Sequence, residues 1–272
     1  AGCTCLQARV IRNTNFQVAY GGGSMTSDVT FVLTSCGRMD LLDQTLESFF
    51  KQNTYPLKAM YVIEDSYDQE VYKQITERWG DKVTLLLNDP KLGQIASIEK
   101  VYAMVDTPYV FHCEDDWLFT RPGFMEENKA IMESDPSIIQ VWLESKESAA
   151  RLDIFSYDNR KEVNGLAFER VNVAEGWEWG YFSFRPGLKR MSDYKRLGGY
   201  GQFLNELDIS VAYRKMGYHT VIIEEPAIED LGEGRTVPDP TRKWPTRRKS
   251  NKPKGLKRLW SHIHRLVTEG KW

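Results

Sequence analysis

Between residues 30 and 112 the sequence alternates short apolar runs with segments whose apolar residues recur at helical spacing. The apolar runs predict buried strands at 30–34, 59–63, 83–87 and 109–112. The intervening segments predict helices at 41–50, 69–79 and 95–105. Strands that alternate with helices of this length form βαβ units, so we expect an α/β fold with a mostly parallel central sheet flanked by helices. Later in the chain the pattern is looser and predicts strands at 138–143 and 220–223 and a helix at 204–216.

The composition indicates an ordinary soluble globular protein. The chain has 272 residues, 41% of them hydrophobic, and a formal net charge of −2, so overall charge favours neither nucleic acid nor membrane as a partner. Its four cysteines, Cys3, Cys5, Cys36 and Cys113, are too scattered for a disulfide framework or a zinc site. We therefore expect a reducing, cytoplasmic location. The sequence contains neither an apolar run of about 18 residues nor a signal-peptide pattern.

Acidic residues follow two of the predicted strands. Asp65 comes after the strand at 59–63, and Glu114-Asp115-Asp116 comes after the strand at 109–112. Parallel sheets bind ligands beyond the carboxyl ends of their strands. Adjacent carboxylates repel one another unless a cation or hydrogen-bond donors offset their charge, and hard oxygen ligands suit magnesium or manganese. The triplet therefore indicates a metal site, with a solvated acidic turn as the alternative.

Four short motifs occur along the chain in a fixed order. They are Thr34-Ser35-Cys36-Gly37-Arg38, Glu64-Asp65-Ser66, Lys91-Leu92-Gly93 and Cys113-Glu114-Asp115-Asp116. In this order, over roughly residues 30 to 235, the chain resembles the family 2 glycosyltransferases and their GT-A relatives, and the triplet is similar to their DxD motif. The resemblance implies a Rossmann-like GT-A fold and transfer of a sugar from a nucleotide-sugar, by default a UDP-sugar, with Mn²⁺ or Mg²⁺.

The resemblance also implies roles for individual residues. Asp65 would contact the base or ribose of the nucleotide, in a pocket also lined by Thr34 and Arg38. Lys91 and Gly93 would lie near the ribose or phosphates. Glu114 and Asp115 would face the ribose and donor sugar, and Asp116 would ligate the metal. Structural alternatives remain open, since Arg38 could serve only to pair with a carboxylate and Asp65 could be an ordinary turn residue.

The segment Asn205-Glu206-Leu207-Asp208 is similar to the family's acidic pair at the start of a helix that ends in Gly-Tyr, here Gly217-Tyr218. The family has Glu-Asp where this chain has Asn205-Glu206, so the resemblance implies Glu206 as the catalytic base, with Asp208 as the second candidate. Such a base removes the proton of an acceptor hydroxyl during attack, and a single displacement inverts the anomeric carbon. Alternatively, Glu206 is a helix-N-terminal acid favoured by the helix dipole.

For two further segments the sequence allows both a functional and a structural interpretation. Asp230 stands near the position where relatives often carry a metal-binding His, and Arg235 could pair with phosphate oxygens, although a plain surface loop is the alternative. The aromatic segment 177–181 could form the floor of a sugar site or belong to the core.

The expected domain organisation has three parts. Residues 1–24 end in Gly21-Gly22-Gly23-Ser24 before Met25, which indicates a tag, a linker or a disordered arm, with a tethered acceptor peptide as the alternative. Residues 25–240 form the glycosyltransferase domain, with a nucleotide-binding half at 28–120 and an acceptor half at 121–240. Residues 241–272 form a basic tail that ends in an amphipathic helix.

The sequence does not identify the acceptor, which could be a glycan, a lipid-linked sugar, a protein or modified DNA. The basic tail fits a peripheral membrane contact, a nucleic-acid contact or a solvated helix. Two other functions remain open: a nucleotidyltransferase, although no glycine-rich basic loop follows the first predicted strand, and a catalytically silent membrane- or nucleic-acid-binding module.

Overall fold

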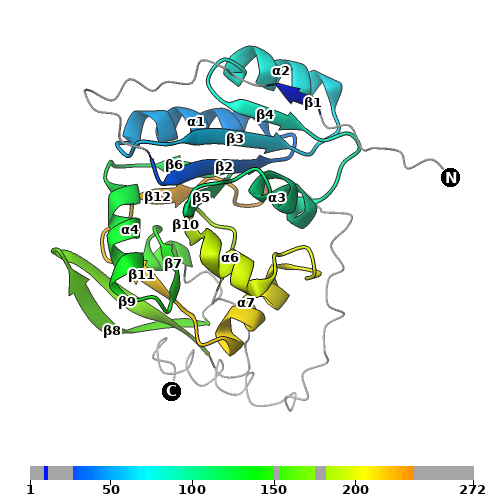
Figure 1. Cartoon of the computed structure of the whole chain (residues 1–272). Coiled ribbons are helices and arrows are strands. Elements are labelled where there is room, and N and C mark those ends of the chain that lie inside the picture. Colours follow the sequence, from blue (N-terminus) through cyan, green and yellow to red (C-terminus); the bar gives the residue numbers. More distant parts are fainter. Residues whose placement is uncertain (1–8, 12–26, 150–153, 175–181, 236–272) are drawn as a thin grey trace, which may run out of the picture. The chain divides into compact units, whose positions relative to one another are not determined.

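A computed structural model describes residues 9–11, 27–149, 154–174 and 182–235 of the chain (Figure 1). The basic tail predicted at 241–272 and the aromatic segment at 177–181 lie outside these residues. Within the described part, no helix is long and apolar enough to cross a membrane.

The central sheet has six strands in the order β1-β4-β3-β2-β5-β10. Their bounds are β1 Arg9–Ile11, β2 Val29–Ser35, β3 Ala59–Glu64, β4 Thr84–Leu87, β5 Tyr109–Glu114 and β10 Gly187–Arg190. The four inner strands, β4, β3, β2 and β5, run parallel, whereas β1 and β10 are antiparallel edge strands. Strand β1 lies within the segment 1–24, the part that the sequence analysis kept apart from the domain.

Helices cover both faces of this sheet because its buried strands are apolar on both sides. On β2, Phe31 and Leu33 belong to a core shared with helices α1 (Met39–Gln52) and α2 (Gln69–Trp79). Val32, between them, faces the opposite side and packs in a second core with α3 (Gln94–Tyr102) and α7 (Glu206–Lys215). Successive side chains of a strand point to opposite faces, so an uninterrupted apolar run is what a two-sided sheet requires.

Two of the helices begin at side-chain caps that hold neighbouring backbone amides. The Asp68 carboxylate accepts hydrogen bonds from the amides of Glu70 and Val71 at the start of α2. The Asn205 side chain accepts one from the Asp208 amide, 3.1 Å away, at the start of α7. Such caps satisfy backbone donors that have no partner within the helix. The Asn205 cap thereby fixes where Glu206 enters its helix.

A second sheet has the strand order β7-β11-β9-β8, with β7 at Ile138–Trp142 and β11 at His219–Ile223. Strands β8 (Phe155–Val163) and β9 (Leu166–Val173) form a hairpin that the sequence analysis did not predict. Its turn is Asn164-Gly165, and both residues have positive φ values, 52° and 80°. This geometry is typical of a two-residue hairpin turn and favours an Asn-Gly pair.

A short two-stranded ribbon joins β6 (Trp117–Phe119) to β12 (Ile228–Asp230). Asp230 pairs with Trp117 in this ribbon, and the Trp117 amide donates to Thr45 Oγ1 of α1 over 3.0 Å. The remaining helices are α4 (Phe124–Ser134), α5 (Lys146–Ala149) and α6 (Met191–Leu197). The predicted fold class is confirmed: a mostly parallel central sheet is flanked by helices.

Candidate functional site

The carboxyl ends of β2, β3 and β5 lie side by side because these strands are parallel neighbours. Ser35 of β2 pairs with Glu64 of β3, and Thr34 pairs with Glu114 of β5. The loops that follow carry most of the residues singled out from the sequence. The alternation of strands and helices therefore gathers motifs that are up to about eighty residues apart at one edge of the sheet.

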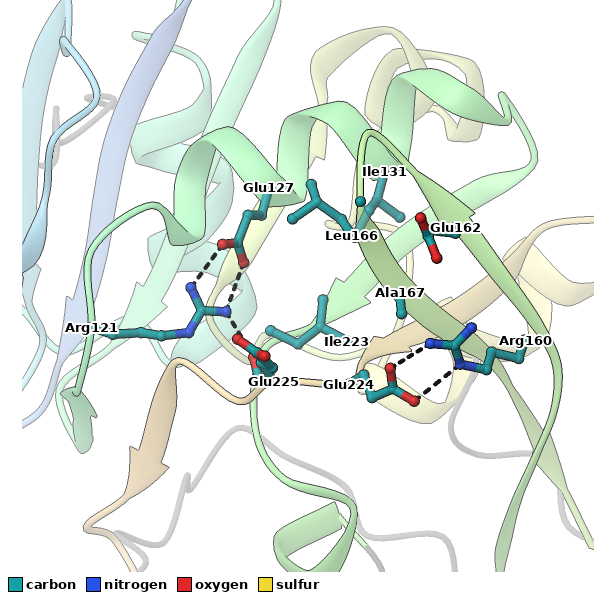
Figure 2. Close-up of a pocket in the computed structure, with 11 residues that line it drawn as sticks. Arg121, Glu127, Ile131, Arg160, Glu162, Leu166, Ala167, Ile223, Glu224 and Glu225 are labelled. Carbon is teal, nitrogen blue, oxygen red and sulfur yellow. Dashed lines mark hydrogen bonds and ion pairs between the residues drawn. The ribbon is translucent and has the colours of Figure 1, made fainter.

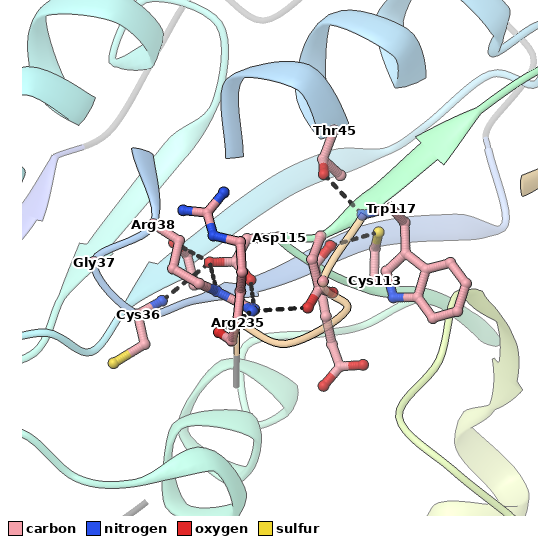
Figure 3. Close-up of polar contacts among 12 residues, drawn as sticks. Cys36, Gly37, Arg38, Thr45, Cys113, Asp115, Trp117 and Arg235 are labelled. Atoms are coloured by element: carbon pink, nitrogen blue, oxygen red, sulfur yellow. Dashed lines mark hydrogen bonds and ion pairs between the residues drawn. The ribbon is translucent and has the colours of Figure 1, made fainter. Parts of the chain in front are cut away.

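Arg38 connects two acidic residues of the triplet (Figure 3). Its guanidinium contacts both oxygens of Asp115, and its Nη1 lies 2.9 Å from Asp116 Oδ2. The same Nη1 donates to the Arg235 carbonyl over 3.2 Å. The Asp115 side chain is 1% exposed and that of Asp116 is 18% exposed. Asp115 is therefore an internal partner of Arg38, whereas Asp116 also reaches the surface.

Asp116 lies against the segment that follows β12. The Leu231 amide donates to the Asp116 carbonyl over 2.8 Å, and the Gly232 amide donates to Asp230 Oδ1 over 2.6 Å. Burial raises the pKa of Asp116 to about 6, and the negative charge of Asp230 acts in the same direction. The structure thus brings together the two residues expected at the metal. Within the described residues, no cluster of three or more His, Cys, Asp or Glu side chains is arranged to hold a metal ion.

The Asp65 carboxylate holds the loop before α3. It accepts hydrogen bonds from the amides of Leu92 at 2.7 Å and Gly93 at 2.8 Å, and from Asn88 Nδ2 at 2.8 Å. Gly93 has a φ of 88°, a conformation in which a side chain would be strained. Asp65 therefore fixes the position of the loop that also carries Lys91, whose Nζ lies 3.1 Å from Cys36 Sγ.

Glu206 and Glu114 bring negative charge from two sides of the site. Glu206 is the first residue of α7, and its Oε2 accepts a hydrogen bond from the Phe184 amide at 2.9 Å. Glu114 Oε1 accepts one from Gln94 Nε2, also at 2.9 Å. Burial, together with the negative charges of Asp116 and Glu206, raises the pKa of Glu114 to about 8. Glu206 is thus within electrostatic reach of the acidic triplet.

The structure gives Arg235, Thr34 and Asp208 contacts or positions that differ from those expected at a donor or catalytic site. The Arg235 guanidinium makes two hydrogen bonds to the exposed Asp40, at 2.6 and 2.9 Å. Its carbonyl, and not its side chain, contacts Arg38. Thr34 is buried within β2. Asp208 contributes its backbone amide to the Asn205 cap.

Sequence reasoning missed the cationic residues on the other side of Glu206. Lys189 lies in β10 and is 2% exposed. Arg185 forms an ion pair with the buried Glu144 at 2.5 Å and lies over the Trp142 ring, 4.6 Å from its centre. A short run with two basic residues, such as Gly187–Arg190, gives no signal of burial by itself. These residues become recognisable only when the fold buries Lys189 and pairs Arg185 with Glu144.

A cavity of about 170 Å³ lies away from the acidic cluster, between α4 and the β8–β9 hairpin (Figure 2). Two ion pairs border it, Arg121 with Glu127 at 2.7 Å and Arg160 with Glu224 at 2.8 Å. Leu166 contributes to its apolar wall. None of the residues that the sequence analysis singled out lines this cavity.

Two solved structures superpose on this chain at low sequence identity. No family model matches the sequence, and no curated protein matches it. A mannosyltransferase, PcManGT from Pyrobaculum calidifontis, solved with GDP-Man and Mn²⁺, superposes with a TM-score of 0.51 at 16% identity over 74% of this chain. Residues 1–349 of S. aureus TarS superpose with a TM-score of 0.51 at 12% identity over 75% of this chain.

The fold is that of the GT-A glycosyltransferases. The match covers 57% of the PcManGT chain and 60% of the TarS chain, so this chain spans less than two thirds of either. At sequence identities of 16% and 12%, the similarity to these structures shows the fold alone. The roles of individual residues depend on the site described above.

Proposed function

We propose that this chain is a glycosyltransferase that moves a sugar from a nucleotide-sugar to a hydroxyl of an acceptor, with inversion at the anomeric carbon. The observation that best supports the proposal is the convergence of carboxylates from distant parts of the chain. Glu114 interacts with Asp116 and with Glu206, and Asp116 also interacts with Asp230. Titratable groups with strongly shifted pKa values gather at active sites because catalysis needs them there.

The donor would bind over the loops that follow β2, β3 and β4. In this proposal Asp65, together with Thr34 and Arg38, faces the base and ribose, and Lys91 and Gly93 lie near the phosphates. The three hydrogen bonds that Asp65 accepts support a rigid, preformed loop for this purpose. We propose UDP as the nucleotide, with GDP as the alternative, since the PcManGT structure holds GDP-Man.

Asp116 and Asp230 would hold the divalent cation, Mn²⁺ or Mg²⁺. Both offer hard oxygen ligands, and the pKa of Asp116 is raised first by burial and then by the negative charges of Asp115 and Asp230, which a cation would offset. Two carboxylates fit such an ion because Mg²⁺-type sites use one or two carboxylates and complete their coordination with water and substrate phosphates. When bound, the ion supplies positive charge that stabilises the diphosphate leaving group. Arg38 adds a permanent positive charge at the same place.

Glu206 would act as the general base. The Phe184 amide, 2.9 Å from Oε2, orients the carboxylate. Glu206 takes the proton of the acceptor hydroxyl while that oxygen forms a bond to the anomeric carbon. The bond from the anomeric carbon to the diphosphate breaks on the opposite face, and its electron pair leaves with the phosphate oxygen. Configuration is inverted in this single step. Asp208 is the second candidate for this role.

The decisive experiment measures the thermal stability of the full chain with a panel of nucleotide-sugars, in the presence and absence of Mn²⁺. A bound donor stabilises the folded state in proportion to the logarithm of its concentration over Kd. We expect one UDP-sugar, or GDP-mannose, to raise Tm only when Mn²⁺ is present. Asp116→Asn should remove this response, whereas Asp106→Asn, at an exposed ion pair with Lys58, should keep it. If no donor raises Tm, the proposal is wrong; release of pyrophosphate from a nucleoside triphosphate supplied together with a sugar 1-phosphate would indicate a nucleotidyltransferase instead.

A further inference from the structure

Lys189 carries a charged group deep inside the molecule. It lies on the edge strand β10, opposite Val110 of β5, and is 2% exposed. Its Nζ donates to the Arg185 carbonyl over 3.4 Å and lies 5.2 Å from the centre of the Phe182 ring. Within the described residues, no carboxylate lies within 4.0 Å of this nitrogen. Burying an ammonium without an adjacent counter-ion costs several kcal/mol, so the surroundings of Lys189 must offset the cost.

Three charged residues act on Lys189. Glu206 of α7 and Glu114 of β5 favour its charged form, whereas Arg185 opposes it. Burial is the largest effect and lowers the pKa of Lys189 to about 7. His112 of β5 is also fully buried, and its pKa is well below the usual value, first through burial and then through the Lys189 charge. Lys189 is therefore a buried cationic side chain whose charge interacts with that of Glu206.

A short peptide segment also links Lys189 to Glu206. The Phe184 amide donates to Glu206, and the carbonyl of the next residue, Arg185, accepts from Lys189. The two side chains thus hold peptide groups of the same short segment, separated by one further peptide group. A change at Lys189 would affect Glu206 in two ways, through its charge and through the position of the Phe184 amide.

We propose that Lys189 is a positioning residue for Glu206, supplying a positive charge near its carboxylate and fixing the segment that orients it. This inference deepens the proposed function and rests on it, because it assumes that Glu206 is the base. Lys189 does not touch the substrate in this proposal. It acts by supplying positive charge near Glu206, opposite in sign to the charge of Glu114, and by holding the Arg185 carbonyl next to the residue whose amide orients Glu206.

The first test compares Lys189→Met and Lys189→Arg in the full chain, using the nucleotide-sugar that the donor panel identifies and following its consumption. For Lys189→Met we expect the acid limb of the pH profile of kcat to move up by about 1 pH unit, since the field of one charge is removed. The rate at pH 6 should fall severalfold, at most about tenfold, and recover towards pH 8, with KM for the donor unchanged. Lys189→Arg should retain the wild-type profile. A uniform loss at every pH would overturn the inference.

A second test needs no turnover and stays informative if Lys189→Met is inactive. Glu206→Gln, Lys189→Met and the double variant form a cycle in which urea unfolding is measured at pH 6.5. Glu206→Gln should lower the folding equilibrium constant severalfold in the presence of Lys189 and have a smaller effect in its absence. Equal effects in both backgrounds would refute the coupling. If the wild type binds no nucleotide-sugar but the cycle shows coupling, the proposed function fails while the Lys189–Glu206 interaction stands.

Discussion

The backbone of Gly232 lies so close to Asp116 that a β-carbon on this residue would be 2.2 Å from Asp116 Oδ2 and 2.8 Å from Cγ. No real β-carbon approaches another heavy atom so closely, so the segment after β12 can pass the carboxylate only with glycine at this position. The contact holds Asp116 next to Asp230, the two residues that we propose as metal ligands. The glycine thus determines where the Asp116 carboxylate lies.

Gly232→Ala should displace Asp116 and weaken the response to Mn²⁺. The added methyl group must push either the carboxylate or the backbone away, at a cost of about 1–3 kcal/mol. We expect a lower free energy of unfolding and a Tm that no longer rises when Mn²⁺ and donor are added. Gly234→Ala is the matched control: it strains a backbone with a φ of 73°, but its β-carbon would contact nothing. An unchanged Mn²⁺ response in Gly232→Ala would contradict the prediction.

Arg38→Met should be strongly destabilising. Among the residues that the structure describes, it leaves the buried Asp115 with only the Ser35 hydroxyl at 3.1 Å and the Cys36 amide at 3.4 Å as hydrogen-bond donors. Breaking a buried ion pair by removing one partner costs about 3–5 kcal/mol. Arg160→Met provides the comparison, because its pair with Glu224 is exposed and should contribute little to the free energy of unfolding. Urea unfolding of both variants measures the difference, and similar losses would argue against a special role for Arg38.

Asp65→Asn should loosen the loop that precedes α3. An amide has one acceptor oxygen in place of two, and its NH₂ group would face one of the N–H donors now bound by Asp65. We expect a loss of about 1–3 kcal/mol in unfolding free energy and weaker binding of UDP, measured by calorimetry. Asp68→Ala removes the cap of α2 and should cost about 1 kcal/mol without changing UDP affinity. Equal UDP affinity in wild type and Asp65→Asn would show that the loop is not part of the donor site.

Glu114 gives the protein a specific dependence of stability on pH. Its pKa rises from 4.5 to about 8 on folding, so between these values the native state binds a proton that the unfolded chain releases. The stability contributed by this proton is complete below about pH 4.5 and is lost as pH rises through 8. Glu114→Gln cannot lose a proton, and its side-chain oxygen can still accept from Gln94. Relative to wild type, the variant should therefore gain stability from pH 5 to pH 8 without Mn²⁺, as measured by urea unfolding. A difference that does not change with pH would contradict this assignment.

The regular part of the fold could be predicted because the spacing of apolar residues along the sequence differs between strands and helices. Helix α2 has the bounds that the apolar spacing predicted, 69–79, and the strand predicted at 220–223 differs from β11 by one residue. The β8–β9 hairpin escaped prediction because most of β8 is exposed and its charged residues obscure the alternation. The Asn164-Gly165 pair was the signal that could have revealed it.

The site was less predictable than the fold. Asp116 and Asp230 were singled out through a family resemblance, whereas their contact depends on the pairing of β6 with β12, which no local pattern indicates. Lys189 could not be found, because its burial results from packing against residues far away in the sequence. Its neighbour Glu206 was selected as a base, yet nothing in the sequence indicated which cation would face it.

The antiparallel pairing of β1 with β4 has a practical consequence. Arg9, Val10 and Ile11 are opposite Leu87, Leu86 and Leu85, so this segment occupies the outer hydrogen-bonding edge of β4. A shortened protein that began at Met25 would expose that edge and its apolar strand to other molecules. Such a protein would tend to associate through intermolecular strand addition, and solubility measurements on shortened chains should show the difference.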